Sequence, residues 1–580
     1  MRVIPTFRVA ASLLVLAAVA FAQEKPPTGV YTPDKPPAEK APTKQVGGLR
    51  FLDTSEVTIV NVEVSVTDKK GPILNLKPAD FEVYQDGRLQ PLTNFALYTR
   101  PLPVATTAAA APSPTAAPAA PTPEATPAPK REPRFITFYV DNENVMPMNR
   151  NRVLRKVVDW VESYLRPPDQ AMVVSYQRSL KVLQPFTSDP EEIASALRVM
   201  FKYTGGATDI NSSRKQVEDY INDNSSASAA GSAMSQAQAF SREQYNTLTF
   251  TIGALRELVG MLSGLPGKKA VIYVSDGLAM TPGLELYYEI QDKYNYQSAV
   301  TEAREFDATD LFRSLVNSAT AADVTFYTID AKGLDSDLGI EAENRQARSP
   351  LSAGIVSSNY QDSLMFMASE TGGMAILNSN DPTAGLEKIA TDFETYYSLG
   401  YRLIPTGQDR VHFIQVKVKS HPEYRLVYRQ RFIEKSLPTR IADRVMSGLA
   451  FDLEDNPLGI DVKTGDPAPA ANGRWTVPVE VRVPLEKIAL IPNGDKLAGY
   501  LMVYYAARDS EGKQSDLQRV EHPIEIPTND YEAAKKQYYT LTASLLVEPG
   551  TYRISVGVRD ELTNQAGYAL ASKAVHPEKE

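Results

Sequence analysis

Side chains that could bind a metal ion follow two of the most apolar runs of the chain. They occur at three places: Asp141, Asn142, Glu143 and Asn144 directly after "FITFYV", Asp276 after "AVIYVS", and Thr208 with Asp209 in the glycine-rich turn "TGGATD". Carboxylates and hydroxyls that converge on one point form an oxygen-rich site, which suits Mg²⁺, Mn²⁺ or Ca²⁺. The other interpretation is a polar strand end that meets water and binds nothing.

The elements around these residues predict that they lie close together. From about residue 134 to 405, strand-like apolar runs alternate with helix-like stretches, such as the helical pattern over 150–165. Such alternation predicts a parallel sheet that helices cover on both faces. Ligands in open parallel sheets bind at the carboxyl ends of the strands. Asp141 and Asp276 therefore share one edge if their strands are neighbours.

The order of these strings resembles the von Willebrand factor A domain, and more closely the bacterial VWFA-related family of exported proteins. The strings that carry the resemblance are "VTDKKGPILNLKPADFEVYQDG", "FYVDNENV", "TGGATD", "VIYVSDG", "ASETGGMAI" and "TDFETYYSLGYRL", and together they span roughly residues 55–430. The resemblance implies a doubly wound sheet with a metal-ion-dependent adhesion site on one edge. The ordered set is far more specific than any single string.

The family's metal site has the pattern D-x-S-x-S, then a threonine, then an aspartate. By resemblance these ligands are Asp141, Thr208 and Asp276, but Glu143 and Val145 stand where the two serines belong. Three carboxylates would leave a divalent cation with a net charge of about −1, which attracts a partner's carboxylate less. Val145 also removes a hydroxyl ligand.

Two interpretations of Glu143 stay open: it replaces a ligand, or it abolishes the site. We favour the second, a degenerate site, so no cofactor is expected with certainty, and a bound ion would be Mg²⁺ or Ca²⁺. Without a cation the clustered carboxylates repel one another, and some tend to stay protonated. Asparagine or arginine side chains nearby could relieve this repulsion, and Arg150 and Arg152 are the candidate arginines.

Two stretches interrupt the α/β pattern. Residues 211–240 are rich in Ser, Ala and Gln, which predicts a flexible loop or a weak helix, and residues 278–301 carry several tyrosines. Aromatic residues exposed on loops are often partner contacts. The candidate partner-binding residues are Asn142, Asn144, Asp209, Tyr287, Tyr288 and Tyr294.

Composition argues against several classes of function. The chain has no cysteine, which excludes disulfides and thiol catalysis, and its four histidines all lie outside the α/β pattern. It has no G-x-S-x-G elbow, H-E-x-x-H motif or P-loop. We therefore predict that it is not an enzyme. The net charge of −9 argues against nucleic acid as a partner.

The remaining patterns divide the chain into further regions. A basic start, a short apolar core and an A-x-A end predict a signal peptide over 1–22, so the protein is expected to be exported to the periplasm or beyond. No later segment is apolar enough to span a membrane. The predicted regions are a disordered leader (23–50), a small β module (51–100), an Ala/Pro-rich linker (101–133), the A-like α/β domain (134–405), a β extension (406–438) and an Ig-like β-sandwich (439–580).

These predictions favour an exported, non-enzymatic scaffold that binds a protein partner of unknown identity. Two alternatives remain, a divalent-metal-dependent adhesion protein and an envelope hydrolase.

Overall fold

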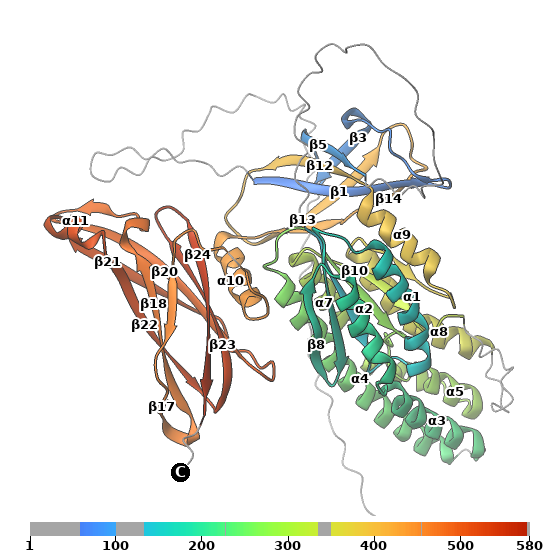
Figure 1. Ribbon diagram of the computed structural model, residues 1–580. Coiled ribbons are helices and arrows are strands. Elements are labelled where there is room, and N and C mark those ends of the chain that lie inside the picture. The colour runs from blue at the N-terminus through green and yellow to red at the C-terminus, as the bar shows by residue number, and fades with distance from the viewer. Residues whose placement is uncertain (1–57, 100–132, 227, 335–349, 454, 577–580) are drawn as a thin grey trace, which may run out of the picture. The chain divides into compact units, whose positions relative to one another are not determined.

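The structure is a computed structural model that describes residues 58–99, 133–226, 228–334, 350–453 and 455–576 (Figure 1). The predicted signal peptide and leader, and the predicted linker up to residue 132, lie outside the described residues. None of the helices in the described ranges is both long and apolar enough to cross a membrane.

The α/β domain is built on a six-stranded sheet with the strand order β11-β10-β9-β6-β7-β8. The strands are β6 (Phe135–Asp141), β7 (Gln170–Gln177), β8 (Ser179–Thr187), β9 (Lys269–Ser275), β10 (Val324–Asp330) and β11 (Ala375–Ile376). All neighbours are parallel except β8, which runs antiparallel to β7. Every residue of β6 and β9 is buried, as their unbroken apolar runs require. The predicted mostly parallel sheet is confirmed.

Helices cover both faces of this sheet, so it is doubly wound. One core holds α1 (Pro147–Tyr164), α2 (Pro190–Val199) and α9 (Thr383–Glu394), and the other holds the C-terminal half of α4 (Ala229–Leu262), α7 (Thr309–Ala321) and α8 (Pro350–Glu370). Helix α2 begins as the sequence predicts, because the Asp189 carboxylate accepts the Glu191 N–H at 2.9 Å.

The chain order places a switch point at the carboxyl ends of β6 and β9, and we call this edge of the sheet the crevice edge. From β6 the chain passes to β7 on one side of it, and later returns to β9 on the other side. Ligand sites in open α/β sheets lie where the strand order reverses in this way. The two strands pair directly, with Val140 opposite Val274, so Asp141 and Asp276 do share an edge as predicted.

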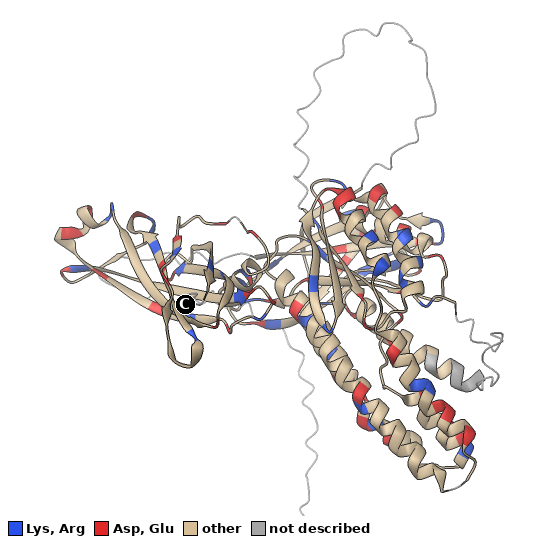
Figure 2. Ribbon diagram, turned by 60° about the horizontal axis from the view of Figure 1, so that its bottom comes forward, with Lys and Arg blue, Asp and Glu red and all other residues tan. Residues whose placement is uncertain are grey.

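The two interruptions of the α/β pattern form one helical extension, so of the two alternatives for 211–240 the flexible loop is wrong and the helix is confirmed. The extension consists of α3 (Ala207–Asp223), the N-terminal half of α4, α5 (Leu284–Tyr294) and α6 (Ala299–Glu302). Apolar residues of both interruptions, among them Ile221, Ala237 and Leu286, pack into a core of their own. Alanine favours helix, and neither stretch could bury its apolar face alone. Figure 2 shows acidic and basic residues interspersed along these helices.

The small β module is assembled from two distant parts of the chain. Its strands are β1 (Thr58–Asp68), β2 (Gly71–Pro72), β3 (Phe81–Gln85), β4 (Arg88–Gln90), β5 (Leu92–Tyr98), β12 (Tyr396–Leu403), β13 (Arg410–Val418), β14 (Arg425–Val427) and β15 (Arg431–Glu434). β12 pairs with β1 and β5, and β13 pairs with β3. The predicted β extension thus completes the β module, and the α/β domain is inserted between β5 and β12.

Two further antiparallel sheets follow α10 (Leu437–Gly448). One contains β16 (Asp461–Thr464), β17 (Ala468–Pro469), β18 (Trp475–Pro484) and β22 (Tyr538–Val547). The other contains β19 (Ile491–Asn493), β20 (Lys496–Asp509), β21 (Gln518–Pro527), β23 (Gly550–Asp560) and β24 (Ala566–Val575), and α11 (Tyr531–Ala534) precedes β22. Residues from both sheets form one core, which includes Val481, Val503 and Val556. The immunoglobulin-like character stays a prediction.

Candidate functional site

Asp141 ends β6 and is completely buried, with 0% of its surface exposed. The side-chain amide of Asn144 donates to both of its carboxylate oxygens, at 3.1 and 3.0 Å. The Tyr273 hydroxyl, which comes from β9, donates to Oδ2. Neutral donors of the protein thus occupy both oxygens of this carboxylate.

Asp276 follows β9 and is held in the same way. The Met146 backbone N–H donates to its Oδ2 at 2.8 Å, and the Asn149 side-chain amide lies 3.2 and 3.1 Å from its two oxygens. The backbone N–H of Asp276 itself donates to the Asn144 carbonyl at 3.0 Å. The β6–α1 loop therefore links the ends of both strands.

The protonation of the two aspartates reflects these neutral surroundings. Burial raises the pKa of Asp141 to about 6, although the hydrogen bonds from Tyr273 and Asn144 act in the opposite direction. Burial likewise raises the pKa of Asp276 to about 6, against the donors Met146 and Asn149. The charge of Lys332 also lowers the pKa of Asp276, but burial outweighs these contributions at both aspartates.

Glu143 lies at the crevice edge and is only partly buried. Its Oε2 is shielded from water and finds no hydrogen-bond partner among the described residues. Burial raises the pKa of Glu143, the charge of Arg178 lowers it and the charge of exposed Asp209 raises it. Glu143 and Asp209 are therefore the carboxylates at this edge that protein donors do not saturate.

The "TGGATD" turn reaches the β6–α1 loop, as the sequence predicts. The Gly206 N–H donates to the Asn142 carbonyl at 2.9 Å, and the Asn142 side chain donates to the Thr204 carbonyl. A Cβ atom at Gly206 would lie only 2.9 Å from the Glu143 carbonyl oxygen, so this close approach requires glycine.

Thr208 does not join the carboxylates. It is exposed, and its hydroxyl lies 4.0 Å from the sulfur of Met146. Asn142 is buried and is bonded by the guanidinium of Arg150, a side chain with 0% exposure, which also donates to the Tyr203 carbonyl at 2.8 Å. Asn142 is therefore not available to a partner.

The arginines do not relieve the carboxylate repulsion that the sequence predicts. Arg150 is occupied by Asn142 and Tyr203, and Arg152 donates to the backbone carbonyls of Ala331 and Lys332. The relieving donors are Asn144, Asn149 and Tyr273. Sequence reasoning named only the first of these, since nothing in the spacing of Asn149 or Tyr273 points to the crevice edge.

A divalent cation does not fit these residues. Its two aspartate ligands would have to give up the hydrogen bonds of Asn144 and Asn149, and Val145 is buried where a hydroxyl would be needed. Within the described residues no three His, Cys, Asp or Glu side chains are grouped so that they could hold a metal ion. The side-chain amides of Asn144 and Asn149 occupy the carboxylate oxygens that a cation would bind.

Three of the four tyrosines of 278–301 lie on α5 of the helical extension, and Tyr296 lies in the exposed loop between α5 and α6. Tyr287 is 0% exposed and belongs to the core of the extension, so it is not a partner contact. The Tyr294 hydroxyl donates to the Asn224 carbonyl at 2.7 Å and joins α5 to the end of α3. Tyr288 is partly buried on α5 and stays a candidate.

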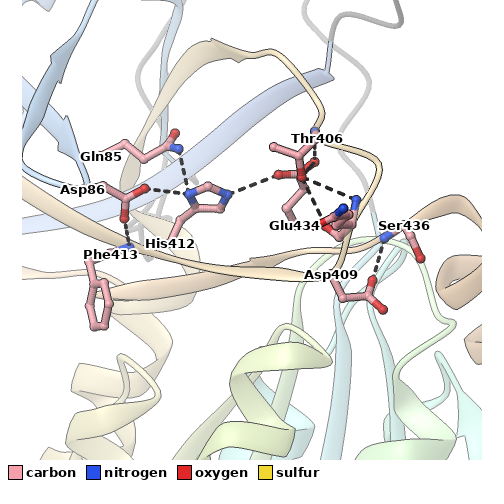
Figure 3. A network of polar contacts seen from close by, with 9 residues as sticks. Gln85, Asp86, Thr406, Asp409, His412, Phe413, Glu434 and Ser436 are labelled. Carbon is pink, nitrogen blue, oxygen red and sulfur yellow. Dashed lines mark hydrogen bonds and ion pairs between the residues drawn. The ribbon is translucent and has the colours of Figure 1, made fainter.

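A second polar cluster lies in the β module, around His412 of β13 (Figure 3). This histidine is 3% exposed, and its ring stacks on that of Phe432. Its Nδ1 lies 2.8 Å from Asp86 Oδ2, and its Nε2 lies 3.2 Å from Glu434 Oε2. Glu434 also accepts the Thr406 N–H. The cluster joins the two halves of the β module across more than three hundred positions of the sequence.

Comparisons with known proteins concern the fold alone. No protein-family model matches the chain, and no curated protein matches it. Among solved structures it is similar to a conserved hypothetical protein, BatB, from Bacteroides thetaiotaomicron, with 11% identity over 45% of this chain and 96% of that chain and a TM-score of 0.21. It is also similar to an aerotolerance-related membrane protein from Bacteroides fragilis, with 12% identity over 45% and 97% and a TM-score of 0.22.

A third similar structure is proximal thread matrix protein 1 of the mussel byssus with a zinc-occupied MIDAS motif. The identity is 13% over 47% of this chain and 48% of that chain, and the TM-score is 0.22. Such values carry no inference about binding. The doubly wound sheet described above agrees with the sequence-based recognition of a von Willebrand factor A-like domain, as a statement about fold.

Proposed function

We propose that this protein is an exported, non-enzymatic interaction scaffold whose α/β domain binds a protein partner at the crevice edge without a metal ion. The observation that carries the proposal is the saturation of Asp141 and Asp276 by protein donors. An adhesion metal must keep one coordination position open for the partner, and here the ligands are already used.

The charge of this edge indicates the kind of group that a partner presents. Glu143 and Asp209 remain unsaturated, and Arg178 is the cation that faces them. In a metal-dependent site the partner supplies a carboxylate to the cation. Here the edge itself is acidic, so a lysine or arginine of the partner fits it.

The export that the sequence predicts would suit the same function. The predicted signal peptide and the small β domains around the α/β domain suit a protein that presents a binding surface in the periplasm or outside the cell. The α/β domain contains no histidine, so its edge holds no serine–histidine pair of the kind that serine hydrolases use.

The test is capture of partners from envelope extract, followed by crosslinking to identify the contact residue. We expect specific capture that is equal in Mg²⁺ and in a chelator. Asp209→Lys and Glu143→Lys should each weaken capture on the order of tenfold, since each puts a like charge opposite a basic partner group.

Asp159→Lys is the matched control, because Asp159 is an exposed carboxylate on α1 with the same change of charge. Its capture should equal that of the wild type. Capture that requires Mg²⁺, Mn²⁺ or Ca²⁺ would replace the proposal with metal-dependent adhesion. Capture that both edge variants retain in full would place the partner elsewhere.

A further inference from the structure

Strand β22 (Tyr538–Val547) is an unprotected edge. It pairs with β18 over ten consecutive residues without a register shift, and no strand in the described part of the chain pairs with its other side (Figure 1). Its sequence, "YYTLTASLLV", contains no charged residue, no proline and no glycine. A long, flat edge with free backbone donors and acceptors is a template for another strand.

Among the described strands the shorter edge strand β5 also lacks charge, proline and glycine, but the other edge strands of nine or more residues carry the usual protection. β8 contains Lys181 and Pro185, β21 contains several charged residues with Pro523, and β24 contains Lys573. Lysine and proline at an edge prevent pairing with another chain. The contrast with β22 indicates that its edge is kept free for pairing.

The outward face of β22 is complementary to itself. The exposed residues alternate along the strand, with 56% exposure at Tyr538 and 49% at Leu546 at its two ends. If two copies pair antiparallel about Thr542, then Thr542 faces Thr542, Thr540 faces Ser544 and Tyr538 faces Leu546. The Thr–Thr and Thr–Ser pairs are favourable cross-strand pairs, Tyr538 and Leu546 bring two largely apolar side chains together, and no like charges meet.

Of the neighbouring registers, only the one centred on Thr542 places each exposed residue of β22 opposite another exposed residue of β22. A shift by one residue would place exposed side chains opposite inward-facing ones. A two-fold axis at Ala543 keeps the faces but sets Thr540 against Leu546, and one at Leu541 sets Tyr538 against Ser544 and leaves Leu546 without a partner.

We infer that β22 joins a second copy of this chain, by antiparallel pairing about a two-fold axis at Thr542. The pairing would merge the two four-stranded sheets into one continuous sheet across the dimer. It uses a surface separate from the crevice edge and does not depend on the function proposed for that edge.

Disulfide crosslinking tests both the pairing and its register, because the protein has no cysteine of its own. In purified Thr542→Cys the two thiols would face each other, at the Cα separation of about 4.5–5.5 Å that a disulfide can span. Thr540→Cys alone would place its two thiols about 13 Å apart along the strands, which is too far.

We expect rapid disulfide dimers of Thr542→Cys under mild oxidation and none of Thr540→Cys or Ser544→Cys alone. A mixture of Thr540→Cys with Ser544→Cys should crosslink again. Dimers that form equally in all three single variants would reflect random collision and overturn the inference, as would no dimer in any of them.

Sedimentation of the cysteine-free protein provides an independent measurement. We expect a concentration-dependent dimer whose dissociation constant rises on the order of tenfold in Thr542→Lys, since two lysines would meet on the axis. The control is Ser572→Lys on the exposed face of β24, with circular dichroism to verify folding. A monomer at every concentration, or equal weakening by both lysines, would exclude the β22 dimer.

Discussion

The crevice edge and the β module satisfy their carboxylates differently. At the crevice edge, Asp141 and Asp276 accept from side-chain amides, a phenol and two backbone N–H groups. In the β module, Glu434 accepts from the Thr406 N–H and also faces the imidazole of His412. The hydrogen bonds described at the first region therefore come from neutral donors, while the second region includes a side chain that can carry positive charge.

The pKa values move in opposite directions in the two regions. Burial raises the pKa of Asp141 and of Asp276 to about 6. Burial would also raise the pKa of Glu434, but the Thr406 N–H and His412 outweigh it, so this pKa is lowered. Hydrogen bonds from neutral donors offset only part of the cost of burying a charged carboxylate, so its pKa stays raised. A partner that can be cationic favours the charged form of the carboxylate, so its pKa is lowered.

The largest effect on stability is expected from the replacement of His412. His412→Ala removes a buried ring and leaves Glu434 without that partner, which should lower the free energy of unfolding of the β module by about 2–4 kcal/mol. Hydrogen exchange of peptides from β13 and β15, read by mass spectrometry, measures it. The control is His522→Ala, at a partly buried histidine of β21, which should leave these peptides unchanged. Unchanged protection in His412→Ala would show that the cluster does not stabilise the module.

The second largest expected effect is a gain in the free energy of unfolding, whereas His412→Ala causes a loss. Asp276→Asn keeps an acceptor for Met146 and Asn149 but removes the buried charge, so it should stabilise the α/β domain by about 1–2 kcal/mol near pH 7.5. The fluorescence of Trp160 on α1 reports unfolding of this domain once Trp475 is replaced by phenylalanine.

The pH dependence of this gain follows from the raised pKa. Between the usual value of 3.8 and about 6, the native state holds more protons at Asp276 than the unfolded state does. The free energy of unfolding of the wild type therefore falls as the pH rises through this window. Asparagine does not titrate, so the advantage of Asp276→Asn should shrink towards about pH 4. An advantage that is constant with pH would contradict a buried charge at Asp276.

A smaller loss of stability is expected when a hydrogen-bond donor of Asp276 is removed. Asn149→Ala leaves Asp276 with only the Met146 N–H, and we expect a loss of about 1 kcal/mol near pH 7.5 and less near pH 5, where the carboxyl holds its proton. The same fluorescence measurement applies, and Asn151→Ala serves as the control, which removes a bond of 3.1 Å to the Phe201 carbonyl and one of 3.1 Å from Arg150 Nε. Its effect should not vary over this range of pH.

The smallest effect is expected from metal ions. If amides stand in the place of the cation, millimolar Mg²⁺, Mn²⁺ or Ca²⁺ should leave the thermal midpoint of the α/β domain within about 1 °C of its value in a chelator. A clear rise in the midpoint with one of these ions, abolished in Asp276→Ala, would show that the carboxylates release their amide donors to bind metal.

The sequence predicts which strand ends and turns form the site better than it predicts which side chains contact one another there. Apolar runs that end at Asp141 and Asp276, together with the glycines of "TGGATD", suffice to predict which strand ends and turns meet. They do not predict that Asn149 reaches Asp276 or that Tyr273 reaches Asp141, since these contacts depend on how α1 and β9 are packed. The helical extension was missed for a similar reason, because its two halves are stable only against each other.

The β module has a consequence for how the protein is made. Tyr98 of β5 pairs with Tyr396 of β12, and their rings stack at 5.0 Å. On a ribosome β1 and β5 are completed first and then wait for β12, through the synthesis of on the order of 300 residues, or roughly 15–60 s. The inserted α/β domain holds all strands of its own sheet and can fold during this delay. A chain released early, before Tyr396, would leave β1 and β5 without their partner and open to aggregation.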